Sequence, residues 1–204
     1  MVLQFRKASL EDITWVCELD RKTFRAADLI DHTVFEAWQN HNDESFWVAG
    51  SYAEPRAVHA YFAMLYLGKC AFAAFKAGRV AEGELAAADL LAKSEVRDAR
   101  EAYLFSVVSD APKGSAERRD LKIAVIEHIL AAANHGALAT VYVTTGTTDG
   151  RNVLLRAVQE GLASKVQDAR ERADGHSLYR FDLDPHAAKA WAALAWRAKA
   201  TPLP

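Results

Sequence analysis

Cysteine, proline and long apolar runs are all scarce in this sequence of 204 residues, which has two cysteines and five prolines. Two cysteines, Cys17 and Cys70, are too few for the disulfide framework of a small secreted domain. No run approaches the ~20 apolar residues that cross a membrane, and the opening MVLQFRKASLED lacks the apolar centre of a signal peptide. The sequence therefore predicts a soluble, cytoplasmic protein without a membrane partner.

An excess of charge of one sign is also missing. The sequence has 25 Lys and Arg against 27 Asp and Glu, a formal net charge of -2, and no basic run. Nucleic-acid binding needs a concentrated positive field, so we expect no nucleic acid as a partner. What is present is a composition with 51% hydrophobic and 25% charged residues. A chain of this length and composition can bury one core, which predicts a single domain over residues 1–204.

The first third of the sequence predicts strands and amphipathic helices in alternation. Residues 3–8 predict a strand, and Ser9 to Asp12 predict a helix start, because a hydroxyl and a carboxylate there can accept hydrogen bonds from free backbone N–H groups. That helix runs to about Phe24, and its apolar face places Cys17 in the core. The expected elements that follow are a helix at 31–39 and an antiparallel pair of strands at 46–52 and 57–67.

The stretch 69–100 is alanine-rich and predicts an insertion of two helices, at 69–77 and 83–93. We expect the insertion either to cover a cleft of the domain or to pack against a second subunit in a homodimer. The elements expected after the central stretch are a strand at 140–145, a helix at 152–160, strands at 163–168 and 177–182, and a C-terminal helix within 184–204.

The central stretch, residues 101–134, predicts a strand, a loop and a long helix. Tyr103 to Val108 form an apolar run typical of a strand inside a sheet, and the loop DAPKGS interrupts it before the helix. Free N–H groups and the positive end of the helix dipole meet at such a helix start. This junction is therefore predicted to bind an anion.

Four segments of the sequence resemble the GNAT superfamily of acyl-CoA-dependent N-acyltransferases. They are FRKASLEDI, FWVAG with the long strand after it, SVVSDAP before the central helix, and TTGTTDGRNVLLRAVQEGL, and the resemblance spans residues 3–183. It implies an α+β fold with a mixed, mostly antiparallel sheet flanked by helices, interrupted by the helical insertion between the third and fourth strands and followed by the C-terminal helix. It also implies acetyl-CoA or another acyl-CoA as co-substrate and a small-molecule or peptide amine as acceptor.

The resemblance also assigns a coenzyme A site. The backbone of Ser106, Val107 and Val108 is expected to pair with the pantetheine arm, and the helix start is expected to hold the pyrophosphate. The family has small residues at this helix start. When its pattern is aligned to begin at Arg118, the positions of the small residues hold Leu121 and Ile123 instead. The residues available for the phosphates are Gly114, Ser115, Arg118, Arg119 and Lys122. Alternatively, the three basic residues are the solvated face of an amphipathic helix.

Catalysis requires a deprotonated amine and a protonated leaving thiolate. Glu101, at the start of the central strand, is the candidate base, and its alternative role is an exposed carboxylate at a strand end. Ala157 stands where the family often has a tyrosine that protonates the thiolate. Two functions therefore remain open: an N-acyltransferase, with acetyl as the expected acyl group, and a GNAT-fold binding or regulatory module without catalysis.

No metal site is expected, because His128 and His135 have no third ligand at metal spacing. Phe35 and Trp38, followed by an acidic loop, lie where the family lines its acceptor site and would suit a cationic amine; the alternative is that both rings are core residues.

Overall fold

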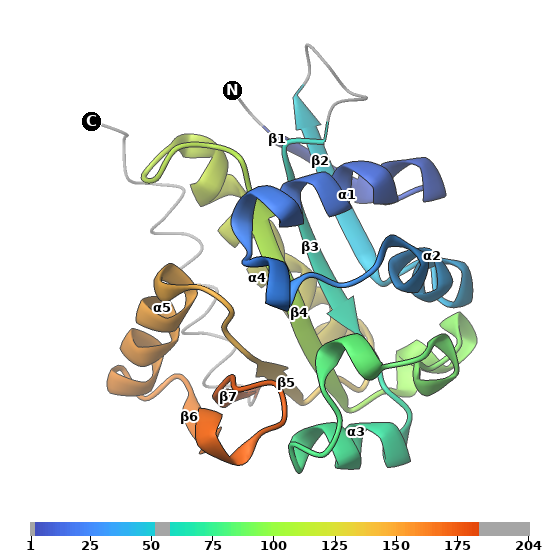
Figure 1. The fold of residues 1–204 in the computed structure, drawn as a ribbon, viewed down its shortest axis with the longest axis vertical. Helices are drawn as coiled ribbons and strands as arrows, with labels where there is room; N and C mark the ends of the chain where they lie inside the picture. The colour runs from blue at the N-terminus through green and yellow to red at the C-terminus, as the bar shows by residue number, and fades with distance from the viewer. Residues whose placement is uncertain (1–2, 52–57, 184–204) are drawn as a thin grey trace.

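The structure is a computed structural model that describes residues 3–51 and 58–183 of the chain. Within these residues one seven-stranded sheet has helices on both faces (Figure 1). The strand order is β1-β2-β3-β4-β5-β7-β6, and every neighbouring pair is antiparallel except β4 and β5. The predicted mixed, mostly antiparallel α+β sheet is therefore confirmed.

The strands are β1 (Leu3–Lys7), β2 (Phe46–Ser51), β3 (Ala60–Leu65), β4 (Glu101–Ser109), β5 (Thr140–Val143), β6 (Ser164–Gln167) and β7 (Leu178–Asp182). The α-helices are α1 (Leu10–Thr23), α2 (His32–His41), α3 (Lys69–Lys76), α4 (Ala116–His135) and α5 (Thr148–Gln159). Short 3₁₀ turns are η1 (Ala26–Asp28), η2 (Glu82–Glu84), η3 (Ala87–Asp89), η4 (Lys93–Asp98) and η5 (Ala169–Glu171).

Side-chain hydrogen bonds cap the starts of α1, α4 and α5. At α1, the backbone N–H of Ser9 donates to the Asp12 carboxylate at 2.7 Å. At α4, the Ser115 hydroxyl accepts from the N–H of Arg118, and at α5 the Thr147 hydroxyl accepts from a backbone N–H one turn later. Each bond satisfies a donor that the helix itself leaves free.

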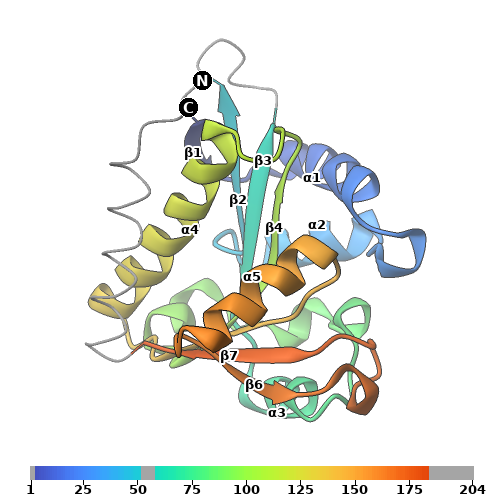
Figure 2. The same cartoon turned by 90° about the vertical axis from the view of Figure 1, so that its left-hand side faces the viewer.

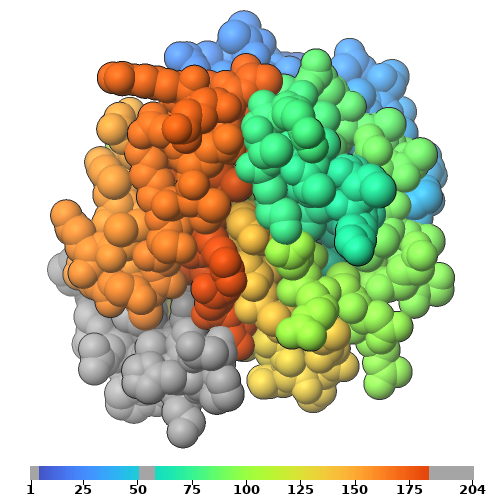
Figure 3. All heavy atoms as spheres, turned by 90° about the horizontal axis from the view of Figure 1, so that it is seen from below, coloured from blue at the N-terminus to red at the C-terminus, as the bar shows by residue number. Residues whose placement is uncertain are grey.

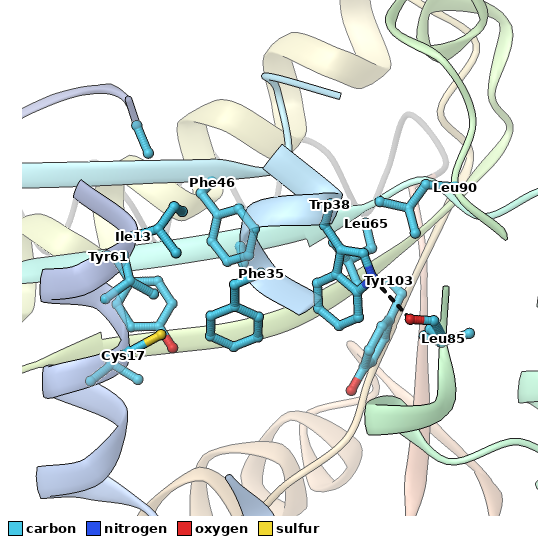
Figure 4. Packing of buried hydrophobic residues seen from close by; sticks show 14 of the residues in the cluster. Ile13, Cys17, Phe35, Trp38, Phe46, Tyr61, Leu65, Leu85, Leu90 and Tyr103 are labelled. Atoms are coloured by element: carbon cyan, nitrogen blue, oxygen red, sulfur yellow. Dashed lines mark hydrogen bonds between the residues drawn. The ribbon is translucent and has the colours of Figure 1, made fainter. Parts of the chain in front are cut away.

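Two apolar clusters lie on opposite faces of the sheet. One is covered by α1, α2 and α3, and the other by α4; Figure 2 shows α4 on one side and α1 and α2 on the other. In the first cluster Phe35 and Trp38 of α2 are fully buried, and the Trp38 ring N–H donates to the carbonyl of Leu85 at 2.9 Å (Figure 4). Cys17 is buried beside Tyr61, as predicted. Aromatic burial on this scale is a major source of stability.

The insertion differs from its prediction. Its first helix is present as α3, but the expected helix at 83–93 is wrong, because this part forms the separate 3₁₀ turns η2, η3 and η4. Carboxylates of Glu84, Asp89 and Glu95 each accept from the backbone N–H three residues earlier and so close one turn at a time. Leu85 and Leu90 are both buried. A spacing of five residues cannot keep both on one helical face, so the chain turns repeatedly instead.

Among the described helices, none is both long enough and apolar enough to cross a membrane. The predicted C-terminal helix within 184–204 lies outside the described residues, as does the turn at 53–56. Strand β3 is shorter than the predicted 57–67, and the last helix begins earlier than predicted, at Thr148.

Candidate functional site

The two parallel strands at the centre of the sheet separate into a fork. Their pairing runs from Glu101↔Thr140 to Leu104↔Val143, whereas β4 continues to Ser109. Over this last part β4 pairs with β3 on one side only, and no described strand pairs with its other edge. An unpaired strand edge offers backbone N–H and C=O groups to an extended ligand.

A β-bulge lies at the point of separation. Ala63 of β3 pairs with Ser106, whereas the next residue of β3 pairs with Leu104, so Phe105 is an additional residue on β4. Bulges bend a strand and increase its twist, which accounts for the departure of β4 from β5. Ser106, Val107 and Val108, the residues expected to contact pantetheine, all lie on the open part, and 40% of Val107 is exposed.

The loop and helix start beside the fork contain small residues. Gly114 has a φ of 81°, and a Cβ added to it would meet no atom within 4 Å. Ser115 and Ala116 follow at the start of α4. Leu121 and Ile123 are buried, and Leu121 packs in the cluster beneath α4. The two bulky residues, Leu121 and Ile123, are therefore turned toward the core. The helix start itself has the small residues Ser115 and Ala116.

Basic side chains surround this helix start unequally. The Arg118 Nε donates to the carbonyl of Ala111 at 2.7 Å and so holds the loop. Lys122 is exposed, Arg119 is half-buried, and Lys113 bridges to Asp149 of α5 at 2.8 Å. The hydrogen bond from Lys113 contributes most to lowering the pKa of Asp149, and the positive charges of Arg118 and Lys122 lower it further. A positive field therefore lies between the starts of α4 and α5.

A carboxylate from the insertion reaches the fork from the opposite face. Glu82 of η2 accepts hydrogen bonds from the hydroxyls of Tyr103 on β4 and Thr144, the residue after β5. The two hydroxyl oxygens lie 2.6 Å apart. Burial raises the pKa of Glu82, and these two hydrogen bonds oppose the rise. This group therefore binds a proton more readily than an exposed glutamate.

A second carboxylate lies further along the same face. Asp20 of α1 accepts from the Tyr61 hydroxyl, which is 3.0 Å from the hydroxyl of Ser106 on the open part of β4. Asp20 is only 5% exposed. Burial raises the pKa of Asp20 to about 7, the Tyr61 hydrogen bond opposes this, and the nearby Glu82 adds to it. Two carboxylates whose pKa is raised by burial thus lie opposite the basic helix start.

Glu101 lies at the closed end of the fork. Its two carboxylate oxygens accept from the Lys76 ammonium at 2.8 and 2.7 Å, and the Tyr142 hydroxyl donates to it at 3.2 Å. It is four residues before Phe105, or about 13 Å along an extended strand. Its role as a base stays a prediction. Phe35 and Trp38 are core residues, so the alternative given for them holds.

Ala157 of α5 packs among apolar residues against β7, so this position of the helix offers no hydroxyl to a leaving thiolate. The described residues contain no group of three or more histidine, cysteine or acidic side chains placed to hold a metal ion.

No protein-family profile and no curated protein matches the sequence. The fold is similar to that of several solved structures. A GphF GNAT-like decarboxylase in complex with isobutyryl-CoA has a TM-score of 0.61 at 15% identity, over 89% of this chain and 100% of the other. The loading GNATL domain of CurA from Lyngbya majuscula has a TM-score of 0.62 at 9% identity, over 89% and 98%. A NatC complex bound to Gag peptide and CoA gives 0.56 at 10%, over 90% and 98%.

At these identities the similarity concerns the fold alone. The strand order, the single parallel pair that opens into a fork and these superpositions together show that the chain has the fold of the GNAT superfamily.

Proposed function

We propose that this protein is an acyl-CoA-dependent N-acyltransferase that transfers an acyl group, most simply acetyl, from the thioester to an amine. The observation that carries the proposal is the fork, with a basic helix start on one face and two carboxylates of raised pKa on the other. Such an arrangement suits an anionic coenzyme A and an amine group that meet from opposite faces. The isobutyryl-CoA named for the GphF decarboxylase and the CoA and Gag peptide named for the NatC complex support an acyl-CoA ligand for this fold.

The coenzyme A moiety is assigned to the α4 face. The open edge of β4 at Ser106 to Val108 would pair with the amides of pantetheine, as an added strand does. Gly114 and Ser115 leave room for phosphate oxygens near the helix start, and Arg118 and Lys122 supply positive charge. Arg119 belongs to the same proposed site. The residues present therefore fit the group that the fold implies.

The acceptor amine is assigned to the opposite face. The amine nitrogen would attack the thioester carbonyl carbon; the new C–N bond forms, the C–S bond breaks, and the thiol leaves with a proton. Of the two carboxylates with a raised pKa, Glu82 contacts the end of the β4–β5 pairing, because it accepts hydrogen bonds from Tyr103 and Thr144. We assign Glu82 the role of the base that takes the proton from the amine. Glu101, the candidate from the sequence, is the alternative base.

Thermal unfolding with acetyl-CoA tests the binding step. A ligand at about a hundred times its dissociation constant stabilises the folded state by ~2.7 kcal/mol. We expect this shift for the natural protein and a smaller one for Arg118→Ala combined with Lys122→Ala, whereas Arg156→Gln, an exposed control on α5 paired with Glu160, should behave like the natural protein. No shift with acetyl-CoA or longer acyl-CoAs would overturn the proposal.

Thiol release in the presence of amines tests the reaction and distinguishes it from the alternative, a binding module without catalysis. The alternative is favoured by Ala157, which provides no hydroxyl at this position of α5. A thermal shift without thiol release would establish the alternative. If Glu82 is the base, Glu82→Gln lowers kcat by about 10²–10⁴-fold, and Glu101→Gln has a smaller effect. The reverse order would assign the base to Glu101.

A further inference from the structure

A basic hollow lies next to the end of β5. It has a volume of about 520 Å³ and is bounded by the start of α5 and by the hairpin of β6 and β7. Its basic lining consists of Arg151 on α5, Lys165 on β6 and Arg170 in η5, with His176 in the connection before β7. Asp168 is the acidic residue of the lining. Positive charge therefore exceeds negative charge around the hollow.

The pairing of these charges leaves two guanidinium groups available. Lys165 and Asp168 pair with each other at 2.5 Å and largely cancel. Within the described residues, neither Arg151 nor Arg170 forms an ion pair, and both are exposed. Guanidinium groups bind carboxylates and phosphates through paired N–H donors. The hollow thus offers two such groups to an anionic ligand.

The hairpin wall of the hollow is anchored to the insertion. The Arg172 side chain is fully buried, donates to the carbonyl of Phe75 at 2.9 Å and pairs with Asp174 at 2.6 Å. The N–H of Ala173 donates to the carbonyl of Gly78 at 3.0 Å. Figure 3 shows the hairpin beside α3 on the underside of the molecule. A wall held in this way reduces the conformational entropy that ligand binding must remove.

Consecutive residues connect the hollow to the proposed reaction site. Thr145 lines it, and the preceding residue, Thr144, donates to Glu82. The Cα atoms of these two residues are about 3.8 Å apart, so a single peptide unit joins the lining of the hollow to the hydrogen-bond partner of Glu82. His176 lines the hollow and also acts electrostatically on Glu82, lowering its pKa when protonated.

We infer that the acceptor is an amine that also carries an anionic group, a carboxylate or a phosphate, a few bonds from the nitrogen. Arg151 and Arg170 bind the anionic group in the hollow while the amine lies at Glu82. This inference rests on the proposed function for the role of Glu82, whereas anion binding in the hollow is independent of it.

Acceptor pairs that differ in the anionic group test the inference. Thiol release from acetyl-CoA is measured with β-alanine against β-alaninamide and with O-phosphoethanolamine against ethanolamine, which separate carboxylate from phosphate. We expect the anionic member of at least one pair to have a kcat/KM at least tenfold higher. Arg151→Gln with Arg170→Gln removes this preference by raising the KM of the anionic acceptor, and leaves the KM of acetyl-CoA unchanged. Arg156→Gln, outside the hollow on the same helix, retains the preference.

A titration without acyl-CoA separates this inference from the proposed function. In amide-detected NMR, β-alanine or O-phosphoethanolamine should shift the signals of Gly175 and Ser177, which line the hollow, and the double variant should lose these shifts. Shifts without any thiol release support the hollow as an anion site and contradict the enzyme proposal. No shifts with either probe, or an acceptor preference unaffected by the double variant, overturn the inference.

Discussion

Replacing Asp20 by asparagine should change how the stability of the protein depends on pH. Burial raises the pKa of Asp20 to about 7, from the ordinary value of 3.8 for an exposed aspartate. Between about pH 4 and pH 7 the folded state therefore binds a proton that the unfolded state has released. The free energy of unfolding of the natural protein must fall as the pH rises through this range, until Asp20 is ionised in both states.

The size of the effect follows from the two pKa values. Each unit of pKa difference corresponds to about 1.4 kcal/mol, and integration from pH 5 to pH 8 gives a loss of about 2.6 kcal/mol for this group. Asparagine has no proton to lose, and its amide oxygen can still accept from Tyr61. The variant should match the natural protein near pH 5 and exceed its stability near pH 8 by about that amount.

Urea unfolding of both proteins at several pH values between 5 and 8 measures this difference, because contributions from all other groups cancel in the comparison. Tyr61→Phe is the matching second variant. It removes a hydrogen bond that lowers the pKa of Asp20 in the folded state, so the loss of stability should continue to a higher pH than in the natural protein. A difference between the natural protein and Asp20→Asn that does not vary with pH would refute the account of Asp20 as a buried carboxylate.

Four further substitutions, one of them a comparison variant, test the packing around the site by urea unfolding. Trp38→Phe removes the hydrogen bond to the Leu85 carbonyl and should destabilise by about 1–3 kcal/mol; no loss would mean that water replaces it. Gly78→Ala, at a φ of 69° and with a Cβ 2.9 Å from a backbone oxygen, should cost more than Gly161→Ala, at a φ of 72° in open space; equal losses would contradict the steric argument. Arg172→Met leaves its partner carboxylate buried without a cation and should destabilise by about 3–5 kcal/mol, whereas a loss under 1 kcal/mol would contradict the anchor.

The sequence predicts the regular elements well because their signals are local. The apolar run of β4 and the Ser115 cap of α4 depend on neighbouring residues alone. Alanine has a high helix propensity, so the sequence predicts a helix after α3 where the structure has turns. The propensity is overridden there because the buried residues Leu85 and Leu90 are spaced five apart. The repeated pattern of alanine followed three residues later by an acidic residue, as in Ala81 and Glu84, is a signal that indicates separate turns.

The carboxylates of the site were harder to predict. Asp20 had a local signal, because it follows Ile13, Val16 and Cys17 on the apolar face of α1, where a charged residue is unusual. Glu82 had none, since its partner Thr144 is 62 residues away and only the tertiary fold brings them together. The unpaired edge of β4 likewise depends on where β5 stops, which periodicity does not reveal.

The anchor between Arg172 and Phe75 also determines when the hollow can form during folding. The two residues are separated by 97 positions, so closing this contact orders a long loop of chain. Contacts of such separation form late, after local helices and neighbouring strands are in place. During synthesis from the N-terminus, α1, α2 and the first three strands can assemble while one wall of the hollow has not yet left the ribosome. Anion binding should therefore be among the last properties that the folding chain acquires.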